Sequence, residues 1–326
     1  DYEYFKTISK LDEENERTLK STIDVYRKLG AILTFDCTPF FENNVPRFGE
    51  ICSFSASGGA VYVNSVLGAR TNREAAQSAM CAAITGVTPE YGLLLEQNRA
   101  GDVLIQVEAD VDSEYDYELL GYITPKKMGQ AYHCPVFNGL SKQTTSEQLM
   151  DLGTQLNIHG IVPMFHVAGV TPEAADVHTA FLGRKDPPVV TITNEDLAQA
   201  RAEISAGTGK ADFCILGCPH LTINQVGSIA KMLDGQQLAG QLYIFTSTST
   251  KELAQRMGYL DIIHKAGGEI VINSCVDQPC WSHLYGMSGV TESPKCAYYT
   301  KRWNMTFTVK SIPACIQSVL KGEIVS

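Results

Sequence analysis

The sequence predicts an α/β protein with doubly wound, mainly parallel sheets and flanking helices. The main observation is that short apolar strands alternate with single helices between residues 213 and 273. The strands are expected at 213–216, 242–245 and 269–273, and the helices at 222–233 and 251–266. Strands that are separated by one helix join through right-handed crossovers and lie parallel in one sheet.

Helical and extended patterns also follow one another near the start of the chain. Apolar residues at helical spacing predict a helix over 12–29, which Gly30 ends. We expect a strand over 31–35 and a second extended segment over 58–66. An Ala-rich helix then runs to Ala83, and Thr71 and Glu74 at its start have the spacing of a capping box.

The middle of the chain is less regular. Strands are expected at 103–108, 161–165 and 189–193, and helices at 144–156 and 194–205. The first of these helices has capping-box spacing from Thr144 to Glu147, and the second begins at Asn194. The segment 115–124 fits neither pattern clearly.

The composition is that of a globular protein with an acidic balance. Its 326 residues carry a formal net charge of -10, and no cluster of basic residues stands out. Nucleic acid is therefore not expected as a partner. No apolar run is long enough to cross a bilayer and the first residues lack the features of a signal peptide, so we expect no membrane partner and a cytoplasmic location.

Ten cysteines occur in the chain, which is too low a density for a small disulfide-stapled domain. Several polar or thiol side chains follow directly after predicted strands: Cys37, His166, Cys218, the pair Thr246–Ser247, and Cys275. Parallel strands bring such positions to one edge of a sheet, where ligands bind. Three other cysteines, Cys81, Cys214 and Cys315, fall inside predicted helices or strands and are assigned to packing.

Three thiolates that converge predict a metal centre with one open position. Thiolates favour zinc, copper(I) or iron-sulfur clusters. An iron with an open position can polarise a substrate hydroxyl while a base removes a proton from the neighbouring carbon, which is a dehydration. The spacing alone leaves a second interpretation open, in which cysteines near loops are incidental and Cys134, Cys280 or Cys296 are equally good partners.

Arg70 and Asn72, with Ser65 before them, are candidates for holding an anionic substrate. Guanidinium and amide donors at a helix N-terminus suit a carboxylate. The alternative is a capped and solvated helix start. His166 has two interpretations as well, since a histidine after an apolar strand either contacts substrate or is a hydrogen-bonded core residue.

Several longer motifs resemble the large subunit of the aconitase X family. They are Cys37–Phe40 with Asn44–Glu50, Asn64–Glu74, His166–Ala174, Gly217–His220, Ser274–Cys275, and Ser293–Lys295 with Tyr298–Tyr299. The likeness runs from about residue 29 to the end. It implies an aconitase-like arrangement of several lobes, which we place at 1–150 and 151–326 with the cluster site between them.

The resemblance also implies an activity, a cofactor and a set of site residues. Family members are hydro-lyases with an iron-sulfur cluster, of the 2Fe-2S or 4Fe-4S type, or with a single iron. The three matching ligands are Cys37, Cys218 and Cys275. The implied substrate-binding residues are Ser65, Arg70, Thr71, Asn72, His166, Ser293 and Lys295. A lysine is otherwise expected to be solvated at the surface.

This sequence departs from the family pattern in two places. It lacks the family's further N-terminal portion, and it has Glu292 where the family commonly shows Asn. The resemblance places the catalytic base on a serine of a small subunit, so a partner polypeptide is implied. We expect cis-3-hydroxy-L-proline as the substrate, ahead of mevalonate 5-phosphate.

Two further interpretations belong to other functional classes. In the first, the three cysteines bind zinc or a cluster for structure alone, in a non-catalytic metal-binding or regulatory protein. In the second, the protein binds RNA by analogy with aconitase, which the acidic balance disfavours.

Overall fold

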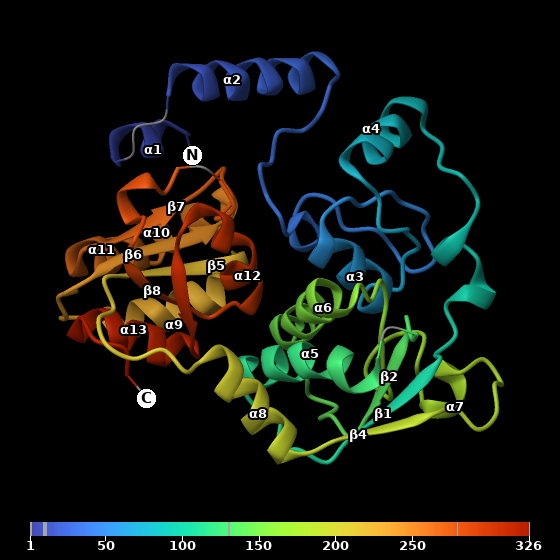
Figure 1. The fold of residues 1–326 in the computed structure, drawn as a ribbon. Coiled ribbons are helices and arrows are strands. Elements are labelled where there is room, and N and C mark those ends of the chain that lie inside the picture. The colour runs from blue at the N-terminus through green and yellow to red at the C-terminus, as the bar shows by residue number, and fades with distance from the viewer. Residues whose placement is uncertain (1, 9–11, 130, 279, 326) are drawn as a thin grey trace. The chain divides into compact units, whose positions relative to one another are not determined.

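A computed structural model describes residues 2–8, 12–129, 131–278 and 280–325 of the chain (Figure 1). Two compact units make up the structure: residues 1–38 with 204–326, and residues 39–203. The first holds a five-stranded parallel sheet and the second a four-stranded parallel sheet, and we name the units by these sheets. Helices flank both sheets, so the predicted α/β class is confirmed.

The five-stranded unit has the strand order β7-β6-β5-β8-β9. Its strands are β5 (Phe213–Leu221), β6 (Gln241–Thr246), β7 (Gly268–Val271), β8 (Ser288–Thr291) and β9 (Thr306–Val309). Its helices are α1 (Tyr2–Ile8), α2 (Glu13–Lys28), α9 (Ile223–Leu233), α10 (Thr248–Arg256), α11 (Tyr259–Ala266), α12 (Pro294–Thr300) and α13 (Ile312–Lys321). The βαβαβ prediction for residues 213–273 is confirmed. The predicted helix 251–266 is divided in two, because Gly258 takes a φ of 76° between α10 and α11.

Burial of the central strand holds this unit together. Every residue of β5 is buried, and Ile215 and Leu216 have no exposed surface. On α9 the side chains of Val226, Ile229 and Leu233 repeat at helical spacing and join the same core. Fully burying one such side chain contributes about 1.5–3 kcal/mol, so this helix is fixed against the sheet that carries Cys218.

The segment before Cys37 differs from the prediction. The helix predicted over 12–29 is confirmed as α2, with the Asp12 carboxylate accepting from the Asn15 N–H at 2.7 Å. The strand predicted over 31–35 is wrong, since this segment pairs with no strand. Ile32 is 84% exposed and Phe35 has a φ of 47°, which an extended strand does not allow. Cys37 therefore follows an irregular segment.

The four-stranded unit has the order β3-β2-β1-β4. Its strands are β1 (Val103–Val107), β2 (Pro135–Asn138), β3 (His166–Val167) and β4 (Val189–Ile192). Its helices are α3 (Ser57–Ser65), α4 (Ala76–Thr85), α5 (Glu114–Met128), α6 (Ser146–Gly160), α7 (Val177–Ala180) and most of α8 (Asn194–Ile204). The strands predicted at 103–108 and 189–193 and the helix at 194–205 are confirmed, and the unclear segment 115–124 is helical.

Some elements of this unit are shifted or of another type. The strand predicted over 161–165 is wrong, because the pairing with β2 begins only at His166. The helix predicted over 144–156 is α6, but its capping box joins Thr145 and Gln148 instead of Thr144 and Glu147. The segment predicted as extended over 58–66 is the helix α3. Its first turn packs so closely on α6 that a Cβ on Gly58 would lie 2.6 Å from the Thr154 hydroxyl, so tertiary packing outweighs local strand propensity.

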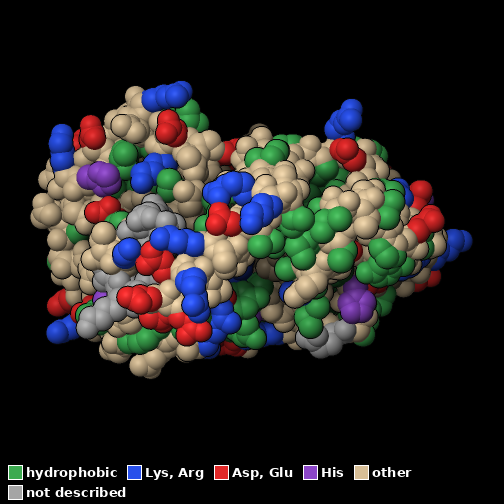
Figure 2. Space-filling view, turned by 90° about the horizontal axis from the view of Figure 1, so that it is seen from above, with side chains coloured by type: hydrophobic (Ala, Val, Ile, Leu, Met, Phe, Trp, Pro, Cys, Tyr) green, Lys and Arg blue, Asp and Glu red, His purple; other side chains and the backbone are tan. Residues whose placement is uncertain are grey.

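Helix α4 is exposed along its length. None of its residues is buried, and Ile84 and Val87 near its end are 61% and 71% exposed. Figure 2 shows hydrophobic side chains gathered on the four-stranded unit, while Lys, Arg, Asp and Glu side chains are frequent over α2. Alanine-rich sequence and the left-handed Gly86 cap stabilise α4 locally. Among the described residues, no helix is long and apolar enough to span a membrane.

The boundaries of the two units differ from the lobes that we expected. They fall at residues 38/39 and 203/204 instead of at residue 150. The expected boundary lies inside α6, which packs on both α3 and α5 and so joins the segments before and after it. The chain enters the five-stranded unit, leaves it for the four-stranded unit, and returns.

Candidate functional site

Cys218 and Cys275 lie toward the carboxyl ends of strands in the five-stranded unit. Cys275 follows β7, as predicted. Cys218 lies inside β5 and not beyond it, because β5 continues to Leu221 after an irregularity in its pairing with β6. Ligands of parallel α/β sheets bind outside this edge, so the position is suited to a functional site.

The irregular stretch of β5 depends on Gly217. Its φ of 106° lies in the region that favours glycine, and a Cβ there would lie 2.2 Å from the Phe245 carbonyl oxygen. The next peptide bond, between Cys218 and Pro219, is cis. This local path sets where the Cys218 side chain leaves the strand.

The charge of Cys37 acts on the ionisation of both other candidate thiols, Cys218 and Cys275. Burial raises the pKa of Cys218 well above that of a free thiol, and nearby Cys296, Cys275 and Cys37 raise it further. Loss of solvent around the sulfur raises the pKa of Cys275, as does the charge of Cys37. All three residues belong to the five-stranded unit.

Positive charge acts to lower the pKa of all three thiols, but only at Cys37 does it outweigh burial. Burial acts to raise its pKa, but the charge and hydrogen bonds of His220, together with the charge of Lys295, outweigh burial and lower it. For Lys295 itself, burial acts to lower the pKa, and the charges of Cys218, Cys37 and Cys275 outweigh burial and raise it. The first turn of α12 thus places an ammonium group beside all three thiols.

His220 lies in β5 two residues after Cys218, with its side chain 2% exposed. Its Nδ1 lies 2.9 Å from Asp36 Oδ1 and its Nε2 lies 2.8 Å from the Ser274 carbonyl oxygen. Its backbone N–H donates to Cys37 Sγ at 3.3 Å. Burial acts to lower the pKa of this imidazole, but the charge of Cys37 and the bond to Asp36 raise it well above its usual value.

Ser293 and Glu292, which follow β8, hold the backbone around Cys218. The Ser293 hydroxyl donates to the Cys218 carbonyl oxygen at 2.5 Å and accepts from the Cys296 N–H at 3.3 Å. Glu292 Oε1 accepts from the N–H groups of Gly217 and Cys218 at 2.7 and 3.3 Å. Burial raises the pKa of Glu292, while these N–H groups oppose the rise.

The remaining candidate residues, Ser65, Arg70, Thr71, Asn72 and His166, belong to the four-stranded unit. The predicted capping box from Thr71 to Glu74 is wrong, because α4 begins only at Ala76 and has no side-chain cap. The segment is extended instead, with parallel bridges from Ile51 to Arg70 and from Phe54 to Arg73. The backbone N–H groups of a helix start are therefore not available at Arg70.

Most of these side chains bond to their own unit. Thr71 Oγ1 donates to the Asn72 carbonyl oxygen and accepts from the Phe54 N–H. Asn72 bonds the backbone of Tyr91 and Leu93. The Ser65 hydroxyl accepts from the Phe165 N–H at 2.9 Å. Arg70 is partly exposed, at 27%: it donates to the Leu94 carbonyl oxygen at 3.0 Å and lies 3.9 Å from the exposed Glu96 carboxylate.

Arg99 organises this segment, and the sequence analysis missed it. Its guanidinium is fully buried and donates to both oxygens of Glu173, to Asn64, and to the carbonyl oxygens of Ala69 and Leu93. Its own carbonyl oxygen lies 2.8 Å from His166 Nε2. A lone arginine between two predicted elements carries no local signal of this role.

The other cysteines are structural or exposed. Cys214 and Cys315 are buried in the core of the five-stranded unit, as predicted. Cys81 does not pack, since it is exposed on α4. Cys280 and Cys296 are buried beside Trp281, and Cys134 in the four-stranded unit bonds the Arg99 carbonyl oxygen at 3.6 Å.

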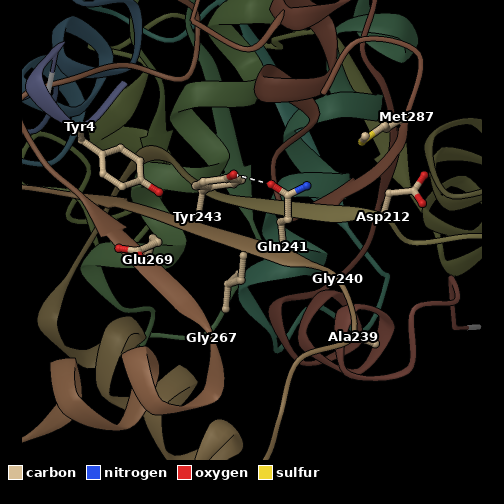
Figure 3. A pocket seen from close by; sticks show the side chains of 10 residues that line it. Tyr4, Asp212, Ala239, Gly240, Gln241, Tyr243, Gly267, Glu269 and Met287 are labelled. Atoms are coloured by element: carbon tan, nitrogen blue, oxygen red, sulfur yellow. Dashed lines mark hydrogen bonds between the residues drawn. The ribbon is translucent and has the colours of Figure 1, made fainter. Parts of the chain in front are cut away.

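A pocket in the five-stranded unit lies at the end of the sheet opposite to Cys218 and Cys275 (Figure 3). Asp212, Gln241, Gly267 and Met287, which line it, lie at or just before the amino ends of β5, β6, β7 and β8. Tyr243 points into it and donates to Gln241 at 2.6 Å. Because the cysteines lie at the other edge, we do not assign the chemistry to this pocket.

Comparison with protein-family models matches almost the whole chain to three domains of one family. Residues 5–97 match the aconitase X first domain, residues 101–202 the second domain, and residues 211–321 the third domain. The chain also resembles a solved structure, the holo-form of aconitase X from Thermococcus kodakaraensis. The TM-score is 0.84 at 32% sequence identity, over 94% of this chain and 78% of that one.

Similar curated proteins carry two different names. The phosphomevalonate dehydratase large subunit of Thermococcus kodakarensis is 34% identical over 94% of this chain and 78% of its own length. That of Methanothermobacter thermautotrophicus is 36% identical over 88% and 70%. The cis-3-hydroxy-L-proline dehydratase of Pseudomonas aeruginosa is 34% identical over 78% of this chain but only 45% of its own length.

Proposed function

The chain belongs to the aconitase X family of dehydratases as a large subunit, and from that premise we propose that it dehydrates a small anionic substrate at an iron-sulfur cluster held by Cys37, Cys218 and Cys275. One observation carries the proposal. The three cysteines come from three distant segments, yet these segments meet at His220. Its backbone N–H donates to Cys37 Sγ at 3.3 Å and its ring lies 2.8 Å from the carbonyl oxygen of Ser274, which precedes Cys275. Cys218 lies two positions before His220 on β5.

The donor set fits an iron-sulfur cluster. Asp36, Cys37 and His220 are the only group of potential ligands among the described residues whose donor atoms all lie within 4.8 Å of one another. Both ring nitrogens of His220 already contact oxygen atoms, so the thiols are the groups left to bind a metal centre. Cys37, Cys218 and Cys275 form no such group, so their sulfur atoms do not all lie within 4.8 Å of one another. Thiolates on a single tetrahedral ion lie about 3.8 Å apart, as a metal–sulfur bond of about 2.3 Å requires. Wider spacing favours a cluster.

Each part of the chain has its own role in this reaction. When bound, the cluster supplies a Lewis acid for the leaving hydroxyl. Lys295 offers an ammonium beside the ligand set and Arg70 a partly exposed guanidinium, and both suit a substrate carboxylate or phosphate. We assign His166 and the other candidate residues of the four-stranded unit to the architecture that carries Arg70.

The base is proposed to come from a small subunit. Relatives of this chain are named as large subunits, which implies such a partner. The cis-3-hydroxy-L-proline dehydratases are longer chains, of which this one covers 45% and 51%. We propose that the portion supplied by a separate small subunit in the first group is part of the same chain in the longer cis-3-hydroxy-L-proline dehydratases.

Mevalonate 5-phosphate is the first substrate to test. This chain covers 78% and 70% of the length of two relatives named for phosphomevalonate, against 45% and 51% of the two cis-3-hydroxy-L-proline dehydratases. This ordering reverses the one that we expected from motifs alone. Cis-3-hydroxy-L-proline remains the second candidate, because the Pseudomonas aeruginosa enzyme named for it is 34% identical to this chain, as is the Thermococcus kodakarensis phosphomevalonate dehydratase large subunit.

The test is purification of the chain without oxygen, together with its small subunit. We expect brown protein with iron and acid-labile sulfide, and a dehydrated product from one of the two compounds. Colourless protein that contains zinc would support a structural metal site in place of the enzyme. Brown protein that dehydrates neither compound would exclude both as substrates, while the assignment of the cluster would still hold.

A further inference from the structure

His220 joins the three segments that carry the cysteines. The residue itself belongs to β5, two positions after Cys218. Its Nδ1 contacts Asp36, which precedes Cys37, and its Nε2 contacts the carbonyl oxygen of Ser274, which precedes Cys275. Its backbone N–H also reaches Cys37 Sγ. One side chain therefore touches the neighbours of two cysteines while its own strand presents the third.

The two oxygen atoms that contact the His220 ring determine which of its nitrogens donate hydrogen bonds. A carbonyl oxygen never donates a hydrogen bond, and an ionised carboxylate only accepts. The ring therefore donates from both nitrogens. Asp36 Oδ1 also accepts from the N–H and hydroxyl of Thr38, at 2.9 and 3.0 Å, which fixes the carboxylate in turn. Both partners are buried, with side chains 2% and 1% exposed, so water does not compete for these bonds.

We infer that His220 is a positioning residue that holds Cys37 and Cys275 at cluster distance from Cys218. The inference rests on the proposed function, because it assigns the three cysteines to one cluster. The segment before Cys37 has no strand partner, and the segment around Cys275 lies in a loop after β7. Neither segment is paired with a strand, so the bonds to His220 hold both, together with the bond from the Trp281 ring N–H to the Val276 carbonyl oxygen beside Cys275.

A different role for the same residues is a metal site made of Asp36, Cys37 and His220, whose donor atoms lie within 4.8 Å of one another. Such a site needs a lone pair on an imidazole nitrogen. Ligation would therefore break the bond to Asp36 or the bond to Ser274. The two roles make opposite predictions for nitrogen coordination.

The variants His220→Ala and Asp36→Asn test the inference, with His264→Gln as the matched control. His264 lies on α11 in the same unit, with a side chain that is 44% exposed. After reconstitution with iron and sulfide, we expect the two site variants to lose iron to a chelator faster than wild type. Loss of such an outer partner typically weakens metal binding by about 10- to 100-fold. The control should match wild type, and circular dichroism checks that each variant is folded.

Two further readouts separate this inference from the proposed function. In the metal-free protein, amide exchange of residues 36–38 and 274–277 should be faster in His220→Ala and in Asp36→Asn, while exchange of β9 stays unchanged. This arm needs no iron, so it decides the inference even if wild type binds none and the proposed function fails. Unchanged amide exchange, or pulsed EPR coupling from a directly bound imidazole nitrogen that His220→Ala removes, would overturn the positioning role.

Discussion

The hydroxyl of Ser293 lies 2.5 Å from the carbonyl oxygen of Cys218, although 75 positions separate the two residues in the chain. Ser293 also caps α12 by accepting the Cys296 N–H. The helix that carries Lys295 and the strand that carries Cys218 are thus joined by one buried hydroxyl.

Replacement of Ser293 by Ala should destabilise the five-stranded unit by about 1–3 kcal/mol. It removes a helix cap and leaves the Cys218 carbonyl oxygen and the Cys296 N–H without a partner in a buried site. Urea unfolding of the metal-free protein measures the loss. The control is Ser228→Ala, on the exposed face of α9, which should change little. Equal effects of the two replacements would contradict the role of the Ser293 hydroxyl.

Replacement of Gly217 by Ala should cost more than replacement of Gly235 by Ala. Both residues have a positive φ, of 106° and 69°, so both variants carry about 1–2 kcal/mol of backbone strain. Only at Gly217 would the new Cβ also meet the Phe245 carbonyl oxygen, whereas nothing lies within 4 Å at Gly235. The difference in unfolding free energy isolates that collision. A Gly217→Ala variant as stable as Gly235→Ala would mean that the strand relaxes around the new methyl group.

Serine in place of Cys37, Cys218 or Cys275 should abolish stable iron binding. Each replacement removes one soft ligand from a set of three. The measurements are iron and sulfide per chain and the visible absorption of the reconstituted protein. Cys81→Ser is the control, because Cys81 is exposed on α4, and it should bind iron as wild type does. Full iron content in any of the three site variants would remove that cysteine from the ligand set.

Arg99→Met should destabilise the four-stranded unit by about 3–5 kcal/mol, because it leaves Glu173 and several buried carbonyl oxygens without their donor. Arg99→Lys should recover little, since one ammonium cannot reach acceptors on so many segments. Thermal unfolding and amide exchange of residues 64–72 measure the effect. Arg256→Met, at a residue whose side chain is 74% exposed, provides the comparison. If Arg99→Lys recovered the stability, the positive charge would be what matters here, and not the several N–H donors of the planar guanidinium.

The contribution of His166 to stability should fall as the pH drops below about 6.5. Burial lowers the pKa of this imidazole, while its bond to the Arg99 carbonyl oxygen opposes the shift. The unfolded chain, with a histidine pKa of about 6.5, then binds more protons than the folded chain, so the stabilisation present above that pH is lost as the pH falls. Urea unfolding between pH 7.5 and 5.5 should show wild type losing stability relative to His166→Gln as the pH falls, a difference from which the opposite contribution of His220 cancels. A pH dependence that His166→Gln leaves unchanged would count against a buried neutral ring.

Local pattern was enough to predict the alternation of strands and helices from β5 to β7. Those strands are buried on both faces and read as apolar runs, and the helices between them have helical periodicity and caps. The motif residues around Cys218 and Cys275 could also be read from the chain. Prediction was wrong for residues 31–35 and 58–66, where apolar and β-branched residues have strand propensity but no neighbouring strand is present to pair with.

The sequence by itself determined the α/β class, the family motifs and the three cysteines as candidates, because these depend on residue type and short spacing. Only the tertiary structure decided that Arg99 organises the segment around Arg70, that Ser293 bonds the backbone beside Cys218, and that His220 meets Asp36 across 184 positions of the chain. The physical reason is that a hydrogen bond has no signature in either partner alone. It exists only once two distant segments have been packed within about 3 Å of each other, out of contact with water.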